Sequence, residues 1–139
     1  MQRIKIPVEE FTTPDPITAQ EDMAITDVRH LMEQHGIRHL PVLRDGVVVG
    51  IISDRDVRLL SGLTSAEKEQ IAAADVMAVN PLSVFAGDTL DDVAYTMSEH
   101  KVGSVIVNEA NGKFLGIFTA TDALNALIEI VRSGGKPAL

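Results

Sequence analysis

The chain has 139 residues, 45 % of them apolar and 23 % charged, which is the size and composition of one ordinary globular domain or of two very small ones. It contains no cysteine, so disulfides, thiolate nucleophiles and zinc–sulfur sites are excluded. With 20 acidic and 12 basic residues its net charge is −8, and only 4 % of the residues are aromatic, a balance that disfavours binding to a nucleic-acid backbone or stacking on bases.

The chain repeats itself, and the repeat defines its organisation. The stretch Pro16-Ile17-Thr18 aligns with Pro81-Leu82-Ser83 at a shift of 65 residues. One inserted residue changes the shift to 66, so that Gly50-Ile51-Ile52-Ser53 aligns with Gly116-Ile117-Phe118-Thr119. Since the apolar class and the glycines that mark turns are kept at almost every aligned position, we interpret the chain as a duplication.

The first copy opens with a short extended piece at residues 17–18 and continues into a helix. Asp22 is expected to cap the start of this helix, and Gly36 to end it in the left-handed conformation. The helix is predicted by apolar residues at spacings of three and four, namely Ile25, Val28, Leu31 and Met32.

A hairpin follows the first helix. Its strands are predicted over residues 38–43 and 47–52, joined by Asp45-Gly46, a dipeptide typical of two-residue hairpin turns. Ser53 then opens a second helix, which we expect to stop at Gly62.

The same elements recur in the second copy, after a short helix that begins with a capping-box pattern at Thr64 and Glu67. Each copy has the order β-α-β-β-α, so we predict an α/β (α+β) fold with two repeats packed about a pseudo-twofold axis, because each copy carries only half of an apolar surface. The second copy is expected to hold a helix from residue 88, strands over 103–108 and 114–118, and a helix over 120–131. The predicted parts are repeat 1 over 1–62, a linker helix over 63–74, repeat 2 over 75–132 and a flexible tail over 133–139.

Both copies end their second strand on the same motif, a hydroxyl residue followed three positions later by an acid: Ser53 with Asp56, and Thr119 with Asp122. One interpretation is a capping box, which stabilises a helix by about 1 kcal/mol. In the other, the helix N-terminus and the hydroxyl bind a phosphate, while the acid accepts hydrogen bonds from the 2′ and 3′ hydroxyls of a ribose. The residues alone leave both interpretations open.

No catalytic or metal-binding constellation stands beside this motif. Ser–His–Asp spacing, a phosphate-binding Walker loop and a dinucleotide fingerprint are all missing. His35 and His39 have a spacing of four, but Gly36 separates them from a common helix face. The sequence therefore predicts neither an enzyme nor a metal site.

Across residues 11–131 the chain resembles a tandem pair of cystathionine β-synthase (CBS) domains, also called a Bateman module. The resemblance rests on the two Gly-to-Asp motifs above together with Asp75-Val76-Met77, Asn80-Pro81-Leu82-Ser83-Val84 and the strand Ile37–Val42. It implies a stand-alone regulatory module that binds an adenosine nucleotide (AMP, ADP, ATP or S-adenosylmethionine) in clefts between the repeats, without a further cofactor. It also implies a homodimer, with signalling by a change in repeat or dimer arrangement.

Carried over by position, the resemblance implies that Asp56 and Asp122 bind ribose and that Ser53 and Thr119 contact phosphate. The first copy adds cations that favour a phosphate-rich ligand at the Asp56 site, namely Arg38, His39, Arg55 and Arg58. The remaining residues expected to bind the nucleotide are Ile17, Thr18, Leu40, Pro41, Leu82, Ser83, Gly103, Ser104 and Thr121.

One alternative keeps the fold but leaves its sites empty: a structural or adaptor module that dimerises and docks an enzyme or a transporter. In either case we expect an effector protein as a partner. A second alternative, a pair that binds RNA or DNA, is disfavoured by the net charge of −8. The N-terminus lacks a secretory signal, and no stretch reaches the ~18 uncharged apolar residues of a membrane span, so a cytoplasmic location without membrane insertion is predicted.

Overall fold

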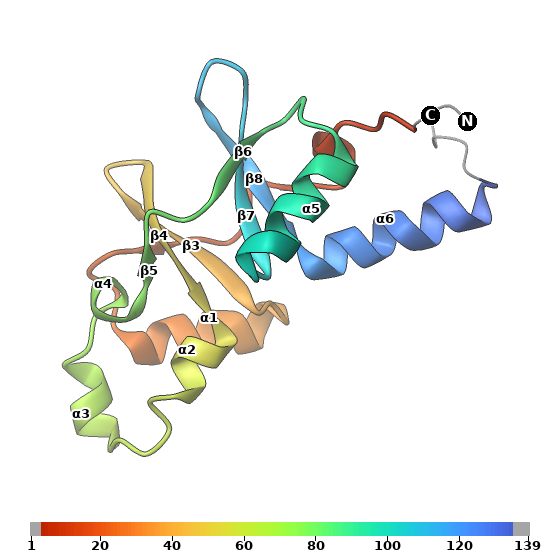
Figure 1. Ribbon diagram of the computed structural model, residues 1–139. Coiled ribbons are helices and arrows are strands. Elements are labelled where there is room, and N and C mark those ends of the chain that lie inside the picture. Colours follow the sequence, from red (N-terminus) through yellow and green to blue (C-terminus); the bar gives the residue numbers. More distant parts are fainter. Residues whose placement is uncertain (1–3, 135–139) are drawn as a thin grey trace. The chain divides into compact units, whose positions relative to one another are not determined.

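The computed structural model describes residues 4–134 and divides the chain into two compact units (Figure 1). The first-repeat unit is Pro16–Pro81, and the second-repeat unit joins the segment before Pro16 to the chain from Leu82 onward. These units differ from the predicted boundaries, because the N-terminal segment completes the sheet of the second repeat and residues 78–79 complete the sheet of the first.

The first-repeat unit is a four-stranded sheet with the order β2-β3-β4-β5, in which β2 runs parallel to β3 and the other neighbours are antiparallel. Its strands are β2 (Ala19–Gln20), β3 (His39–Arg44), β4 (Val47–Ser53) and β5 (Ala78–Val79). Its helices are α1 (Ile25–His35), α2 (Asp54–Arg58), α3 (Ser65–Glu69) and α4 (Ala73–Val76). The extended piece was expected at residues 17–18, but the strand that pairs with β3 begins two residues later, as β2.

Helix α1 ends as predicted but does not begin as predicted. Gly36 has φ 61° and closes the helix, its N–H donating to the carbonyl of Met32. Asp22 does not cap the start, because the N-cap is Ala24 and makes no side-chain bond. A distant backbone group replaces the cap: the Ile25 N–H donates to the carbonyl of Ile71 at 2.9 Å.

The hairpin turn is confirmed, whereas the second helix is shorter than expected. Asp45 and Gly46 have φ values of 51° and 79°, as a two-residue hairpin turn of the mirror-image type requires. Helix α2 stops at Arg58, and the chain continues in tight turns whose N–H groups bond three residues back, as at Leu60 to Val57. The predicted end at Gly62 was therefore wrong by one turn.

The segment predicted as a linker helix belongs to the first-repeat unit. The Thr64–Glu67 capping box is present, with the Glu67 carboxylate accepting from the Thr64 N–H at 3.0 Å. Helix α3 packs beside α1, and α4 packs beside β4. The region is thus two short helices that cover this unit, where one continuous helix was expected.

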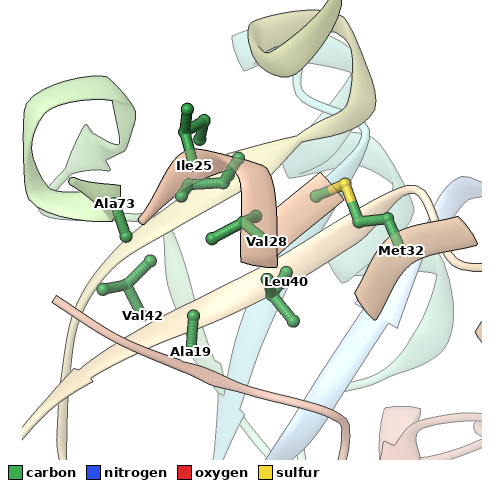
Figure 2. Packing of buried hydrophobic residues seen from close by; sticks show 8 residues of the cluster. Ala19, Ile25, Val28, Met32, Leu40, Val42 and Ala73 are labelled. Atoms are coloured by element: carbon green, nitrogen blue, oxygen red, sulfur yellow. The ribbon is translucent and has the colours of Figure 1, made fainter. Parts of the chain in front are cut away.

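The core of the first-repeat unit lies between α1 and the sheet. Figure 2 shows Ile25, Val28 and Met32 of α1 over Leu40 and Val42 of β3. Ile52 of β4 and the small residues Ala19 and Ala73 complete this buried cluster. The spacing of three and four that predicted the helix thus marks its buried face, although Leu31 is only half-buried.

The second-repeat unit has a sheet with the order β1-β8-β7-β6. Its strands are β1 (Thr13–Pro14), β6 (Ser83–Phe85), β7 (Ser104–Asn108) and β8 (Phe114–Thr119). Its helices are the 3-10 turn η1 (Val8–Glu10), α5 (Leu90–His100) and α6 (Ala120–Arg132). The β-α-β-β-α order of each repeat is confirmed, and α5 begins two residues later than predicted.

The N-terminal segment is built into the core of this unit. Val8 is fully buried with Val93, Val107 and Phe118. The Val8 N–H donates to the carbonyl of Asp88 at 2.8 Å. Of the predicted flexible tail, Ser133 and Gly134 form a turn after α6, and residues 135–139 lie outside the described residues.

Candidate functional site

Both hydroxyl–acid motifs occupy the same place in their own sheets. Ser53 ends β4 opposite His39, and Thr119 ends β8 opposite Ser104. In each unit the first N–H of the following helix donates to the residue just before the facing strand, from Asp54 to Arg38 at 2.8 Å and from Ala120 to Gly103 at 2.9 Å. The two motifs, and the residues His39 and Ser104 that face them, therefore occupy matching positions in the two units.

The capping interpretation is confirmed in both repeats. Asp56 Oδ2 accepts from the Ser53 N–H at 2.9 Å, and Ser53 Oγ accepts from the Asp56 N–H at 3.2 Å. The corresponding distances for Asp122 and Thr119 are also 2.9 and 3.2 Å. Capping fixes the hydroxyl and the carboxylate beside a helix N-terminus, and all four residues are half-buried.

The remaining predicted residues of the first repeat differ in how far they are exposed. Leu40 packs in the core and Pro41 is also fully buried, so within the described structure their side chains are not accessible to a ligand. The guanidinium-bearing residues Arg38 and Arg55 are exposed near the motif. Ile17 and Thr18 are half-buried just before β2, the strand beside β3.

His39 differs electrostatically from the arginines near it. Burial lowers the pKa of its imidazole below the usual value of 6.5, and this effect outweighs the nearby Asp54 and Asp56 carboxylates, which act to raise it. The neutral form of the ring is therefore favoured at pH 7, and this form supplies hydrogen bonds without a positive charge. Arg38 and Arg55 remain as cations near Ser53, while Arg58 lies 3.8 Å from the Asp54 carboxylate.

The second repeat replaces these cations with small or uncharged residues. Gly103 and Thr121 are exposed where the first repeat has Arg38 and Arg55, and Ser104 is buried. Leu82 is half-buried, and its carbonyl accepts from the Ile106 N–H at 2.9 Å. Ser83 begins the neighbouring strand β6 and is exposed.

One residue near Asp122 was missed from the sequence. The hydroxyl of Thr13 donates to Asp122 Oδ1 at 3.4 Å, across 109 positions of the chain. No local sequence pattern predicts this contact, because the contact depends on the pairing of the N-terminal segment with β8. The one available signal was the internal alignment, which pairs Thr13 with Ala78 at the same shift of 65.

The first-repeat unit also has a groove between its helices α1 and α2. The groove measures about 420 Å³, with Met32, Ile37 and Val57 in its lining and Arg29, Arg38 and Arg58 among its polar residues. Neither Ser53 nor Asp56 lines it. This hollow is therefore distinct from the hydroxyl–acid motif, although Arg38 and Asp54 adjoin both.

Two negative findings apply to residues 4–134. They contain no group of three or more His, Asp or Glu side chains arranged to hold a metal ion. None of their helices is both long enough and apolar enough to cross a membrane.

The profile of the CBS domain matches the chain twice, over residues 8–61 and 73–129. The two matches correspond to the two repeats and together cover most of the chain. The protein therefore belongs to the CBS-domain family and carries a tandem CBS pair, or Bateman module.

Solved structures of similar chains share the fold over nearly their whole length. A putative acetoin utilization protein (AcuB) from Vibrio cholerae matches with a TM-score of 0.84 and 28 % identity, covering 96 % of this chain and 100 % of that one. The protein CBSX2, solved in complex with AMP, matches with a TM-score of 0.77 and 28 % identity, covering 91 % of this chain and 98 % of that one. The CBS pair of protein MJ0100 was solved with 5′-methylthioadenosine and S-adenosyl-L-methionine. It matches with a TM-score of 0.76 and 26 % identity, covering 95 % of this chain and 99 % of that one.

Relatives that are enzymes share a limited region with this chain. Inosine-5′-monophosphate dehydrogenase from Korarchaeum cryptofilum is 31 % identical over 114 residues, which are 82 % of this chain and 23 % of the dehydrogenase. The chain spans between about a fifth and a half of the first four curated relatives it matches. The similarity therefore covers a CBS region and does not extend over the rest of these proteins.

Proposed function

We propose that this chain is a non-catalytic regulatory module that binds an adenosine nucleotide, with one candidate site at each hydroxyl–acid motif. The observation that carries the proposal is the repeated geometry, a half-buried hydroxyl and carboxylate held together at a helix N-terminus in both repeats. Relatives solved with AMP and with S-adenosyl-L-methionine support the ligand class. The cleft between repeats, and their packing about a pseudo-twofold axis, remain predictions from the family resemblance.

Each part of the motif has a role suited to a nucleotide. The Ser53 hydroxyl, at the N-terminus of α2, would bind phosphate oxygens. The Asp56 carboxylate would accept the ribose hydroxyls, and hydrogen bonds to a charged group contribute about 1.5–3 kcal/mol each. Arg38 and Arg55 favour a phosphate-bearing ligand here, whereas Gly103 and Thr121 supply no charge at the second site.

Binding of this kind regulates by selecting among arrangements of the repeats or of the dimer. A nucleotide that binds one arrangement more tightly shifts the population toward it, and such couplings are usually about 1–3 kcal/mol. We propose that a separate effector protein reads this change and that the module acts in the cytoplasm.

Replacing Asp56 by alanine is expected to weaken ribonucleotide binding by more than about 1.5 kcal/mol, because the ribose hydroxyls lose a charged acceptor. Thermal shifts with AMP, ADP, ATP, NADH and S-adenosylmethionine test this, since a ligand raises the melting temperature by mass action. Asp56→Asn is the matched control for folding, because its side-chain oxygen can still accept from the Ser53 N–H while the charge is lost.

The outcomes separate the sensor from the adaptor. A shift of several degrees for one adenosine ligand, reduced in both Asp56 variants, would support the proposal. Unchanged affinity in Asp56→Ala and in Asp122→Ala would leave the acids as helix caps alone. Flat curves for all five compounds would favour the structural or adaptor module that docks an enzyme or a transporter.

We further propose that the module forms a homodimer, as the family resemblance implies, and that the exposed face of α6 takes part in the contact. One face of α6 carries large apolar side chains that are 46–67 % exposed, namely Leu124, Leu127, Ile128 and Val131. A contiguous exposed apolar face of this kind typically marks an interaction surface.

Leu127→Glu is therefore expected to convert the dimer to monomers, because it puts a charge into the buried contact. Light scattering coupled to gel filtration measures the mass of each species. Asn125→Glu adds the same charge to α6 outside the apolar face and should leave the dimer intact. A dimer that survives Leu127→Glu would place the contact elsewhere.

A further inference from the structure

Asp56 and Asp122 share one local geometry but differ in the acceptor positions they still offer. A carboxylate has about four lone-pair positions. Asp56 uses one of them, for the Ser53 N–H on Oδ2, and among the described residues no donor reaches its Oδ1. Asp122 accepts at Oδ2 from both the N–H and the hydroxyl of Thr119, at 2.9 and 3.1 Å, and at Oδ1 from the Thr13 hydroxyl at 3.4 Å.

This difference matters for a ligand that donates two hydrogen bonds to one carboxylate. A ribose 2′,3′-diol presents two hydroxyl donors. Asp56 can accept both while keeping its bond to Ser53. Asp122 can accept both only if the Thr13 or the Thr119 hydroxyl turns away. The Ser53 hydroxyl donates to no described group, so its proton is also available to a phosphate, whereas the Thr119 proton is directed at Asp122.

Thr13 is held in place by the fold of the second-repeat unit. Strand β1 pairs with β8, with Thr13 opposite Ile117 and Pro14 opposite Gly116. On one side of Thr13, the hydroxyl of the buried Thr12 donates to the Val8 carbonyl at 2.8 Å. On the other side, the Asp15 N–H donates to the Leu115 carbonyl at 3.2 Å. The strand pairing and these flanking hydrogen bonds therefore hold the Thr13 hydroxyl beside Asp122.

The first repeat contains the matching position without the hydroxyl. Strand β5 pairs with β4 as β1 pairs with β8, with Ala78 opposite Ile51. Ala78 thus has the place relative to Asp56 that Thr13 has relative to Asp122, and its methyl group cannot donate a hydrogen bond. The duplication therefore provides its own control for the effect of this hydroxyl.

We propose that Thr13 competes with a ribose diol for the Asp122 carboxylate, so that the two repeats hold unequal nucleotide sites and the N-terminal segment sets the weaker one. This inference rests on the proposed nucleotide function. Its consequence is ordered filling: AMP first occupies the site at Asp56, and the site at Asp122 fills only at higher concentration.

Calorimetric titration of the full chain with AMP tests this site by site. In an Asp56→Asn background, which isolates the second site, Thr13→Ala is expected to tighten AMP binding about three- to tenfold, the effect of releasing one hydrogen-bond acceptor. Thr13→Ser keeps the hydroxyl and should leave the affinity unchanged. In an Asp122→Asn background, Ala78→Thr should weaken binding at the first site by a similar factor.

The results distinguish this inference from the function on which it rests. Unchanged or weaker binding in Thr13→Ala, with AMP still bound by the unmodified chain, would overturn the competition alone, and weaker binding would make Thr13 a residue that positions Asp122. Equal tightening in Thr13→Ser and Thr13→Ala would overturn it too, because the methyl group would then be responsible. An unmodified chain that binds no AMP would overturn both proposals together.

Discussion

Truncation of Phe118 to alanine is expected to lower the free energy of unfolding of the second-repeat unit by about 3–5 kcal/mol, the usual cost of removing a buried aromatic ring. Phe118 is fully buried on β8, in a cluster with Val8, Val105 and Val107. The neighbours come from strands and from the N-terminal turn, so the cavity cannot close by the movement of a single side chain. Urea unfolding followed by circular dichroism measures the loss.

Phe85→Ala is the matched control, because the same ring is 53 % exposed on β6 of the same sheet. We expect its effect to stay below about 1 kcal/mol, as is usual for substitutions at exposed positions. Losses of similar size in the two variants would contradict the packing of this core. Leu40→Ala removes a side chain from the separate core of the first-repeat unit. If the two units unfold together, Leu40→Ala and Phe118→Ala will shift the same unfolding transition.

Gly116→Ala is expected to destabilise the chain by about 2–3 kcal/mol, the upper part of the range for overpacking. A Cβ atom at Gly116 would collide with the backbone carbonyl of Thr13, and a backbone atom held in a ladder cannot swing aside. We expect β1 to separate from β8, which would also withdraw the Thr13 hydroxyl from Asp122. Hydrogen exchange at the Asp15 amide, which bonds to Leu115 in the intact unit, reports the separation.

Gly50→Ala is the internal comparison for this prediction. The nearest atoms to a Cβ at Gly50 belong to the flexible side chain of Met77, and the Ala78 carbonyl lies 3.0 Å away. Most of the strain can be relieved by a rotation of Met77, so the cost should be smaller than at Gly116. A larger loss at Gly50 than at Gly116 would contradict this difference between the two sheet edges.

Features that depend on a few neighbouring residues were predictable. The hairpin at Asp45-Gly46 and the end of α1 at Gly36 follow from backbone preferences that these residues carry wherever they stand. The capping boxes at Ser53 and Thr119 follow from a hydroxyl and an acid three positions apart. The duplication was visible because each copy repeats the same apolar pattern.

Features that depend on partners distant in the sequence were not predictable. Asp22 was predicted to cap α1, but the Ile71 carbonyl, remote in sequence, satisfies the first N–H of the helix. The burial of Leu40 within the predicted site reflects the direction in which β3 faces its core. The Thr13 contact with Asp122 depends on which edge of which sheet receives the N-terminal segment.

The sequence by itself determined the repeat, the order of elements in each copy and the residues of the two hydroxyl–acid motifs, because these depend on local preferences and on spacing. Only the tertiary structure decided that residues before Pro16 complete the second sheet and that β5 completes the first. It alone distinguished Asp122, already bonded to Thr13, from Asp56. The pairing of β1 with β8 joins segments roughly a hundred residues apart, and it is selected by the burial of Val8 and by the space at Gly116, which no local pattern encodes.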